Sequence, residues 1–250
     1  MSNQEEQPTS TNEHFCSTLE HVGFQFPAGG EYKSRAFLLN KAFWGRGVKL
    51  RCAFLEGAPD LHRKVEELAQ IWPKETGANF AFEFWIDNGL NPLDADIRIG
   101  FQAPRSYSRL GRYAQMVDRT QRTMNLGWMT LELDVDRARA VVLHEFGHAL
   151  GLVHEHMNPA KPINWNSERV RADLKASQGW SNADIDANMF QRYEPSEGFG
   201  TDVDPDSVMM YPIPADWTTD GFSVGFNTRL SAADKALIRQ AYGVRPVFGG

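Results

Sequence analysis

Three histidines and a glutamate lie close together in the sequence, in a spacing suited to metal-assisted hydrolysis. His144 and His148 are four residues apart, so on a helix they lie about 40° apart around the axis and one turn from each other. Their imidazoles can therefore reach one ion. Glu145 points to the same side of the helix and can act as a general base without being a ligand.

A third histidine can reach the same ion only if the helix ends before it. A continuous helix would place His154 about 15 Å along the axis from His144. Gly151 can adopt a left-handed conformation at low cost and reverse the chain, which returns His154 as a third nitrogen ligand. Three nitrogen ligands and one open position are typical of catalytic zinc, because structural zinc sites are closed by four protein ligands. The pattern predicts one Zn²⁺ that activates water, with Glu145 as the base.

Hydrophobic periodicity predicts the elements that position this site. Alternating apolar residues or short apolar runs predict strands at 48–54, 80–86, 97–101 and 126–133. Spacings of three and four predict a helix that begins at Pro59 and ends at Trp72, Pro73 and Gly77. The polar segment 102–124 is predicted to be a surface loop.

Later helices are predicted to begin at Ser167, Ser181 and Ser231. The last two serines are followed three residues later by an aspartate, which is a capping-box pattern. The helix from Ser231 is expected to end near Gly243.

Composition limits the class of protein. A chain of 250 residues with 42% hydrophobic and 12% aromatic residues is expected to fold as one large domain or as two small lobes that share a cleft. The 26 basic and 32 acidic residues give a net charge of 26 minus 32, or -6, which argues against nucleic-acid binding. No apolar run is long enough to span a membrane. We expect a monomer.

The extended motif, H-E-x-x-H-x-x-G-x-x-H, resembles that of the metzincin metallopeptidases. A later segment, Ser-Val-Met-Met-Tyr at 207–211, is similar to their Met-turn. Among metzincins the chain most resembles the astacins, because Glu155 follows the third histidine and Tyr211 stands two residues after Met209. The resemblance covers residues 44–242, including the motifs at 106–112 and 230–234.

The resemblance implies an α+β, two-lobed catalytic domain with a twisted mixed sheet and the zinc helix above the cleft. The irregular lower lobe would end in a C-terminal helix. It implies a catalytic domain at 34–250, divided near residue 154, whereas the polar composition of residues 1–33 predicts a flexible leader or pro-like arm. Met209 would be the hydrophobic floor beneath the zinc, and Tyr211 a movable fifth ligand that stabilises the transition state. The strand at 95–101 resembles the edge strand that pairs with an extended peptide substrate.

Several residues keep alternative interpretations. Met210 is a second candidate for the turn methionine, and Tyr211 could be a core phenol. In astacins the residue matching Glu155 pairs with a buried amino terminus; no processing site is evident here, so its role is open, and it is not expected to be a ligand. His156 is expected to face solvent or to lie behind the ligands, and is an alternative to His154 as a ligand.

The chain departs from the astacin pattern in its cysteines, because astacins usually carry two disulfides and this chain has Cys16 and Cys52. A reducing compartment is consistent with this. Cys52 is predicted to fill the core, and a bridge to Cys16 is left open. The polar first residues lack a secretory signal, which favours a cytoplasmic location, although the resemblance leaves secretion possible. A latency role for Glu31 or Cys16 is not favoured.

Asp202, Asp204 and Asp206 alternate as in a calcium loop. The EF-hand pattern fails, because its sixth position is Ser207 rather than glycine and its twelfth is Ile213 rather than glutamate. An acidic turn that leads into Met209 is the better interpretation.

The sequence favours a zinc endopeptidase that cuts proteins or peptides. Two alternatives are an inactive zinc-bearing module that binds peptides, and a zinc hydrolase of small amides. An intact base and oxyanion donor argue against the first, and the length of the substrates that are cut would distinguish the second. The sequence of residues 212–229 does not indicate which substrate side chains the pocket accepts.

Overall fold

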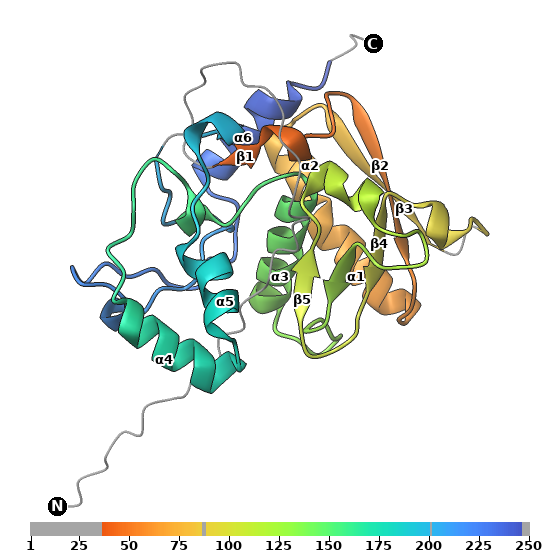
Figure 1. The fold of residues 1–250 in the computed structure, drawn as a ribbon. Helices are drawn as coiled ribbons and strands as arrows, with labels where there is room; N and C mark the ends of the chain where they lie inside the picture. Colours follow the sequence, from red (N-terminus) through yellow and green to blue (C-terminus); the bar gives the residue numbers. More distant parts are fainter. Residues whose placement is uncertain (1–36, 87–88, 201, 247–250) are drawn as a thin grey trace, which may run out of the picture.

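A five-stranded mixed sheet and the helix α3 (Val135–Ala149) form one half of the molecule (Figure 1). The computed structural model describes residues 37–86, 89–200 and 202–246; the leader predicted at 1–33, with Cys16 and Glu31, lies outside them. The strands are β2 (Val48–Phe54), β3 (Phe80–Trp85), β4 (Ile97–Gly100), β5 (Ser106–Ser108) and β6 (Met124–Leu126). Their order is β3-β2-β4-β6-β5, and only β5 is antiparallel to its neighbour.

The main core lies between this sheet and the helices α1 (Pro59–Ala69), α2 (Ile71–Thr76) and α3. Trp72 is fully buried there and donates its indole N–H to the carbonyl of Leu143 in α3, at 3.0 Å. A buried indole keeps a hydrogen bond in this way. Cys52 is also fully buried in β2, which confirms that it fills the core.

The predicted first helix is wrong in one respect, because the structure has two helices here. The first ends at Ala69 and the second begins at Ile71 and contains Pro73. Pro73 is the third residue of this second helix, where its missing N–H breaks no internal hydrogen bond. Gly77 ends α2 with a φ of 60°, as expected of a left-handed cap.

The segment 102–124 is not only a surface loop, because it contains β5 and a 3-10 helix, Gly111–Met116. The strand expected at 126–133 is displaced: β6 ends at Leu126 and the chain then turns. Strand β4 is also not an edge strand, because it pairs with β2 and β6. At this side of the sheet the last strand is β5, and it contacts α3.

The other half of the molecule has little regular sheet. It holds α4 (Ser167–Gln178) and α5 (Asn182–Ile185), and a two-stranded pair of β1 (Leu38–Leu39) with β7 (Gly198–Phe199). The last helix, α6 (Ala232–Tyr242), packs against α2, and its buried residues belong to the main core. The capping boxes predicted at Ser181 and Ser231 are both present. In Figure 1, α3 lies between the sheet and the helices α4 and α5. The α+β fold with a mixed sheet and a C-terminal helix is confirmed.

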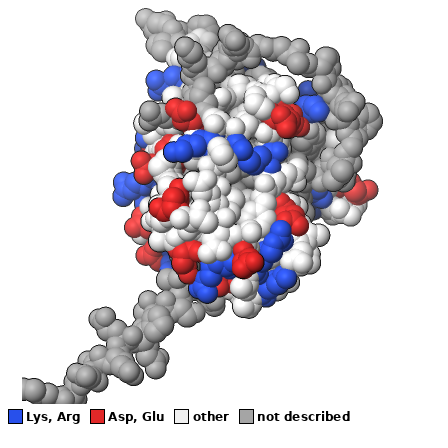
Figure 2. All heavy atoms as spheres, turned by 60° about the vertical axis from the view of Figure 1, so that its left-hand side comes forward, with Lys and Arg blue, Asp and Glu red and all other residues white. Residues whose placement is uncertain are grey.

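Charges of both signs are interspersed on the face shown in Figure 2. This mixture gives that face no extended basic surface of the kind that binds nucleic acid. Within the described residues, no helix combines the length and the apolar character that a membrane span requires.

Candidate metal centre

The helix that carries the first two histidines begins and ends where its sequence requires. The Asp134 carboxylate caps its start by accepting from the backbone N–H groups of Asp136 and Arg137. The helix ends at Ala149, and Gly151 follows with a φ of 99°. The left-handed reversal predicted at Gly151 is confirmed, and it turns the chain back toward the helix.

This reversal brings the three predicted histidines together. Nε2 of His148 lies 3.1 Å from Nε2 of His144 and 3.1 Å from Nε2 of His154. The three side chains form a group that could hold a metal ion, with ligand atoms within 4.8 Å of one another. Nitrogen ligands about 2.0–2.1 Å from a tetrahedral zinc lie about 3.3 Å apart, so the spacing fits that ion.

The protonation of the rings also fits a metal. Nδ1 of His144 lies 2.8 Å from the carbonyl of Val208, and Nδ1 of His148 lies 2.8 Å from the carbonyl of Leu152. A carbonyl can only accept, so both Nδ1 atoms donate, and in the neutral ring both Nε2 atoms carry a lone pair. Two such lone pairs at 3.1 Å repel each other unless a cation lies between them. Burial lowers the pKa of His144 to about 4 and those of His148 and His154 well below the usual value, so all three rings are neutral.

The segment 207–210 forms a turn directly beneath the histidines. Backbone carbonyls of this turn hold the site: that of Val208 accepts from His144, and that of Met209 accepts from the N–H of Glu155 at 3.0 Å. The turn is fixed by Asp234 of α6, whose carboxylate accepts from the Ser207 hydroxyl at 2.6 Å and from the Val208 N–H at 2.9 Å. The aspartate that caps the last helix therefore also positions the metal centre.

Met209 packs against α3 at Gly147. An ideal Cβ built on Gly147 would overlap the Met209 sulfur, so the helix and the turn approach as closely as a glycine allows. Met209 is 1% exposed, and the side chain of Met210 lines the neighbouring pocket instead. This placement supports Met209 as the turn methionine.

Replacing Gly147 by alanine should therefore destabilise the protein by about 1–3 kcal/mol, because the added methyl overpacks the Met209 contact. In an ordinary helix position the same change stabilises by roughly 0.5–1 kcal/mol. Urea unfolding of the variant would show whether its free energy of unfolding falls or rises. A matched control is Gly147→Ala combined with Met209→Ala, which removes the overlap. If Gly147→Ala alone were stabilising, the close contact would be contradicted.

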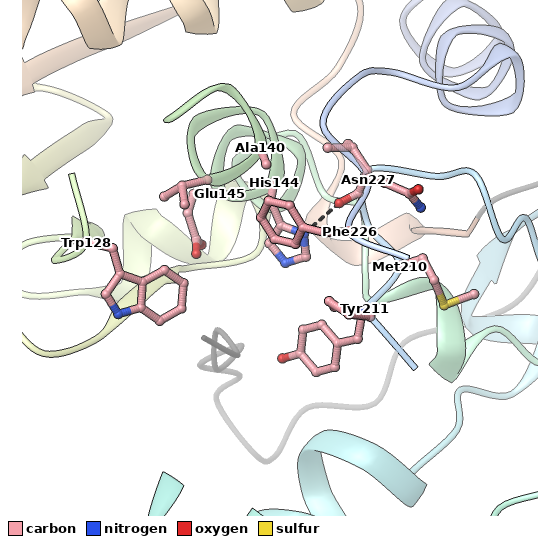
Figure 3. A pocket seen from close by; sticks show the side chains of 11 residues that line it. Trp128, Ala140, His144, Glu145, Met210, Tyr211, Phe226 and Asn227 are labelled. Carbon is pink, nitrogen blue, oxygen red and sulfur yellow. Dashed lines mark hydrogen bonds between the residues drawn. The ribbon is translucent and has the colours of Figure 1, made fainter. Parts of the chain in front are cut away.

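Glu145 and Tyr211 face the same pocket from opposite sides. The pocket is also lined by His144, Trp128 and Phe226 (Figure 3). In that view the Glu145 carboxylate and the Tyr211 hydroxyl both point into the space between the helix and the turn. The Tyr211 ring is buried and packs against His154, with 4.2 Å between ring centroids. The base and the phenol expected from the sequence thus adjoin the histidines.

Glu155 and His156 are both buried, so His156 does not face solvent as one interpretation held. Nε2 of His156 lies 2.8 Å from the carbonyl of Asn188, and its ring packs against Tyr211 in a tilted arrangement. Neither side chain belongs to the three-histidine group. Burial raises the pKa of Glu155 to about 8, and one of its oxygens accepts from Asn158 and from the N–H of Asp204.

The acidic residues before the Met-turn act as turn residues. The Asp204 carboxylate accepts from the N–H of Asp206 at 3.1 Å and from the hydroxyl of Ser231 at 2.6 Å. These bonds join the start of the turn to the cap of α6, which agrees with the acidic-turn interpretation.

Sequence reasoning missed the supports of the site. The carbonyls of Val208 and Leu152 orient two of the histidines. Every residue has a backbone carbonyl, so the amino-acid sequence does not reveal which ones accept these bonds. Asp234 was recognised only as a helix cap. Phe226 and Ala140, which line the pocket, carried no signal either.

The fold and the histidine centre together define a zinc metallopeptidase fold of metzincin-like architecture. The chain is similar to a solved structure of myroilysin, with a TM-score of 0.78, 34% identity, and coverage of 84% of this chain and 100% of that one. A second crystal structure of myroilysin gives a TM-score of 0.59, 31% identity, and coverage of 92% and 100%. The chain belongs to the same family as myroilysin. No family model and no curated protein matches it.

Proposed function

We propose that this protein is a zinc endopeptidase of the astacin type, which cuts peptide bonds within proteins or peptides. One observation carries the proposal: three neutral imidazoles turn their Nε2 atoms toward one point, beside a pocket that Glu145 and Tyr211 also face. His144, His148 and His154 would hold the ion. Bound Zn²⁺ would act as a Lewis acid that polarises the scissile carbonyl and lowers the pKa of water.

The chain's own groups divide the remaining work. The Glu145 carboxylate would take the proton of the attacking water and pass it to the leaving amine. The Tyr211 hydroxyl would donate a hydrogen bond to the oxyanion that forms at the carbonyl carbon. The metal needs no further protein ligand for this role, which leaves one position open for substrate.

Substrate binding would use the sheet edge and the apolar pocket. Strand β5 ends the sheet beside α3, so its outer edge is the one on which an extended peptide could add as a further strand. The pocket beside the metal is lined by Ala140, Val141, Met210 and Phe226, together with His144. These residues suit an apolar substrate side chain next to the cleaved bond.

The test is metal analysis and peptide-library cleavage of the intact chain and of a version that begins at Ser34, the start proposed for the catalytic domain. The expected result is one zinc per chain and internal cuts beside apolar residues. Binding of peptides without cleavage by either version would support an inactive module instead. Cleavage restricted to short amides would point to a small-amide hydrolase.

Replacing Tyr211 by phenylalanine should lower kcat by about 10²–10³-fold, because one oxyanion donor is lost. The ring that packs on His154 and His156 stays, so zinc content and stability should not change. Steady-state kinetics with a quenched peptide would measure the effect. Tyr193→Phe, in a separate buried cluster, is the matched control. An unchanged kcat for Tyr211→Phe would show that Tyr211 is a core residue and not an oxyanion donor.

A further inference from the structure

A second cavity, of about 460 Å³, lies at the outer face of the sheet. Three arginines line it, Arg105, Arg109 and Arg122, and no aspartate or glutamate belongs to its described lining. It shares no lining residue with the pocket beside the histidines. A cavity with three guanidinium groups and no acid in its wall is suited to an anionic ligand.

The sheet explains why these side chains gather at one place. Arg105, Tyr107 and Arg109 alternate along β5 and its flanks, so they share the face opposite the buried Ser106 and Ser108. Across the ladder Tyr107 pairs with Asn125 of β6, and Asn125 pairs with Gly100 of β4. The cavity therefore lies over this face of β5 and β6, and its wall is completed by residues that follow β4 and residues that precede β6.

The floor of the cavity is held by the Asn125 side chain. It accepts from the N–H of Gln102 at 3.0 Å and donates to the carbonyls of Gln102 and Arg105. It also accepts from the Arg122 guanidinium at 2.9 Å. The same guanidinium forms an ion pair with the Glu56 carboxylate, with 3.6 Å between nitrogen and oxygen. Arg122 is therefore part of the wall, whereas Arg105 is exposed and can meet a ligand.

One contact places this cavity beside the catalytic cleft. The indole of Trp128, which lines the metal pocket, donates to the carbonyl of Pro104 in the cavity wall.

We propose that this cavity binds acidic side chains of the polypeptide substrate, at a distance from the bond that is cut. The inference rests on the proposed peptidase function, because it takes the substrate to be a polypeptide. The volume suits several side chains rather than one small ion, and β5, which would align the substrate, forms part of the wall.

The test measures binding, so it does not depend on catalysis. Zinc-loaded full-length Glu145→Gln protein is titrated with a fluorescent peptide that contains several Glu residues, and with its Gln counterpart, by anisotropy. The Glu peptide should bind more tightly. Arg105→Gln and Arg109→Gln should each weaken that binding by about tenfold, the loss of a charge-assisted contact, and leave the Gln peptide unaffected. Arg63→Gln, on the exposed face of α1, is the matched control.

A charge reversal keeps the test independent of folding defects. Arg105→Glu should bind a Lys-containing peptide better than the unchanged protein does. Equal binding of the Glu and Gln peptides, or an equal loss in Arg63→Gln, would overturn the proposal. The peptidase function would still stand if the Gln peptide were cut by the wild type, and would fail separately if neither peptide were cut.

Discussion

Glu145→Ala is expected to lose peptide hydrolysis by about 10²–10⁴-fold while it keeps one zinc per chain. A loss of this size equals the rate enhancement that a positioned general base typically contributes. Glu145 follows His144 on α3 but does not belong to the three-histidine group, and it lines the pocket where a substrate carbonyl would lie. Its removal should therefore affect proton transfer and not coordination.

The measurement combines zinc analysis with kcat/KM on a peptide that the wild type cuts. Glu132→Ala, an exposed glutamate shortly before α3, is the matched control and should behave as wild type. Glu145→Gln should match the alanine variant, because it keeps the volume but cannot take a proton. Near wild-type turnover by either variant would show that another group is the base.

His154→Ala is expected to weaken zinc affinity by more than about 100-fold and to lose activity with it. Loss of an outer residue that merely supports a ligand costs about 10–100-fold, and loss of a ligand should cost more. Two imidazoles on α3 would remain, but the ion would lose one of the three nitrogens that hold it. Competition with a chelator of known affinity measures the change.

His156→Gln is the control, because the His156 ring, like that of His154, packs against Tyr211, yet it lies outside the three-histidine group. It should keep zinc affinity close to that of wild type. If His156→Gln released zinc and His154→Ala did not, the ligand assignment of the two residues would be reversed.

Several elements of the fold could be predicted from local patterns. The apolar alternation at 48–54 matches β2 residue for residue, and the capping boxes at Ser181 and Ser231 begin α5 and α6 as expected. These signals are local, since a strand's period and a helix cap involve residues only a few positions apart. Predictions failed where the signal was short: β5 has three residues, too few to show a period.

The edge strand was assigned wrongly for a related reason. The segment at 97–101 has the clearer apolar pattern because it is buried in the middle of the sheet, between β2 and β6. Strand order depends on pairing between distant segments, and no pattern within one strand encodes it.

The three-histidine cluster could be predicted from the sequence alone. The spacing of His144, His148 and His154 around Gly151 allows one arrangement in which all three reach an ion, because helix geometry and a single left-handed residue set their directions. Tertiary structure decided how that centre is held and what surrounds it. The Val208 carbonyl that orients His144, the Asp234 carboxylate that fixes the turn and the arginine-lined cavity beside β5 all join segments far apart in the chain, and such contacts form only when the chain folds.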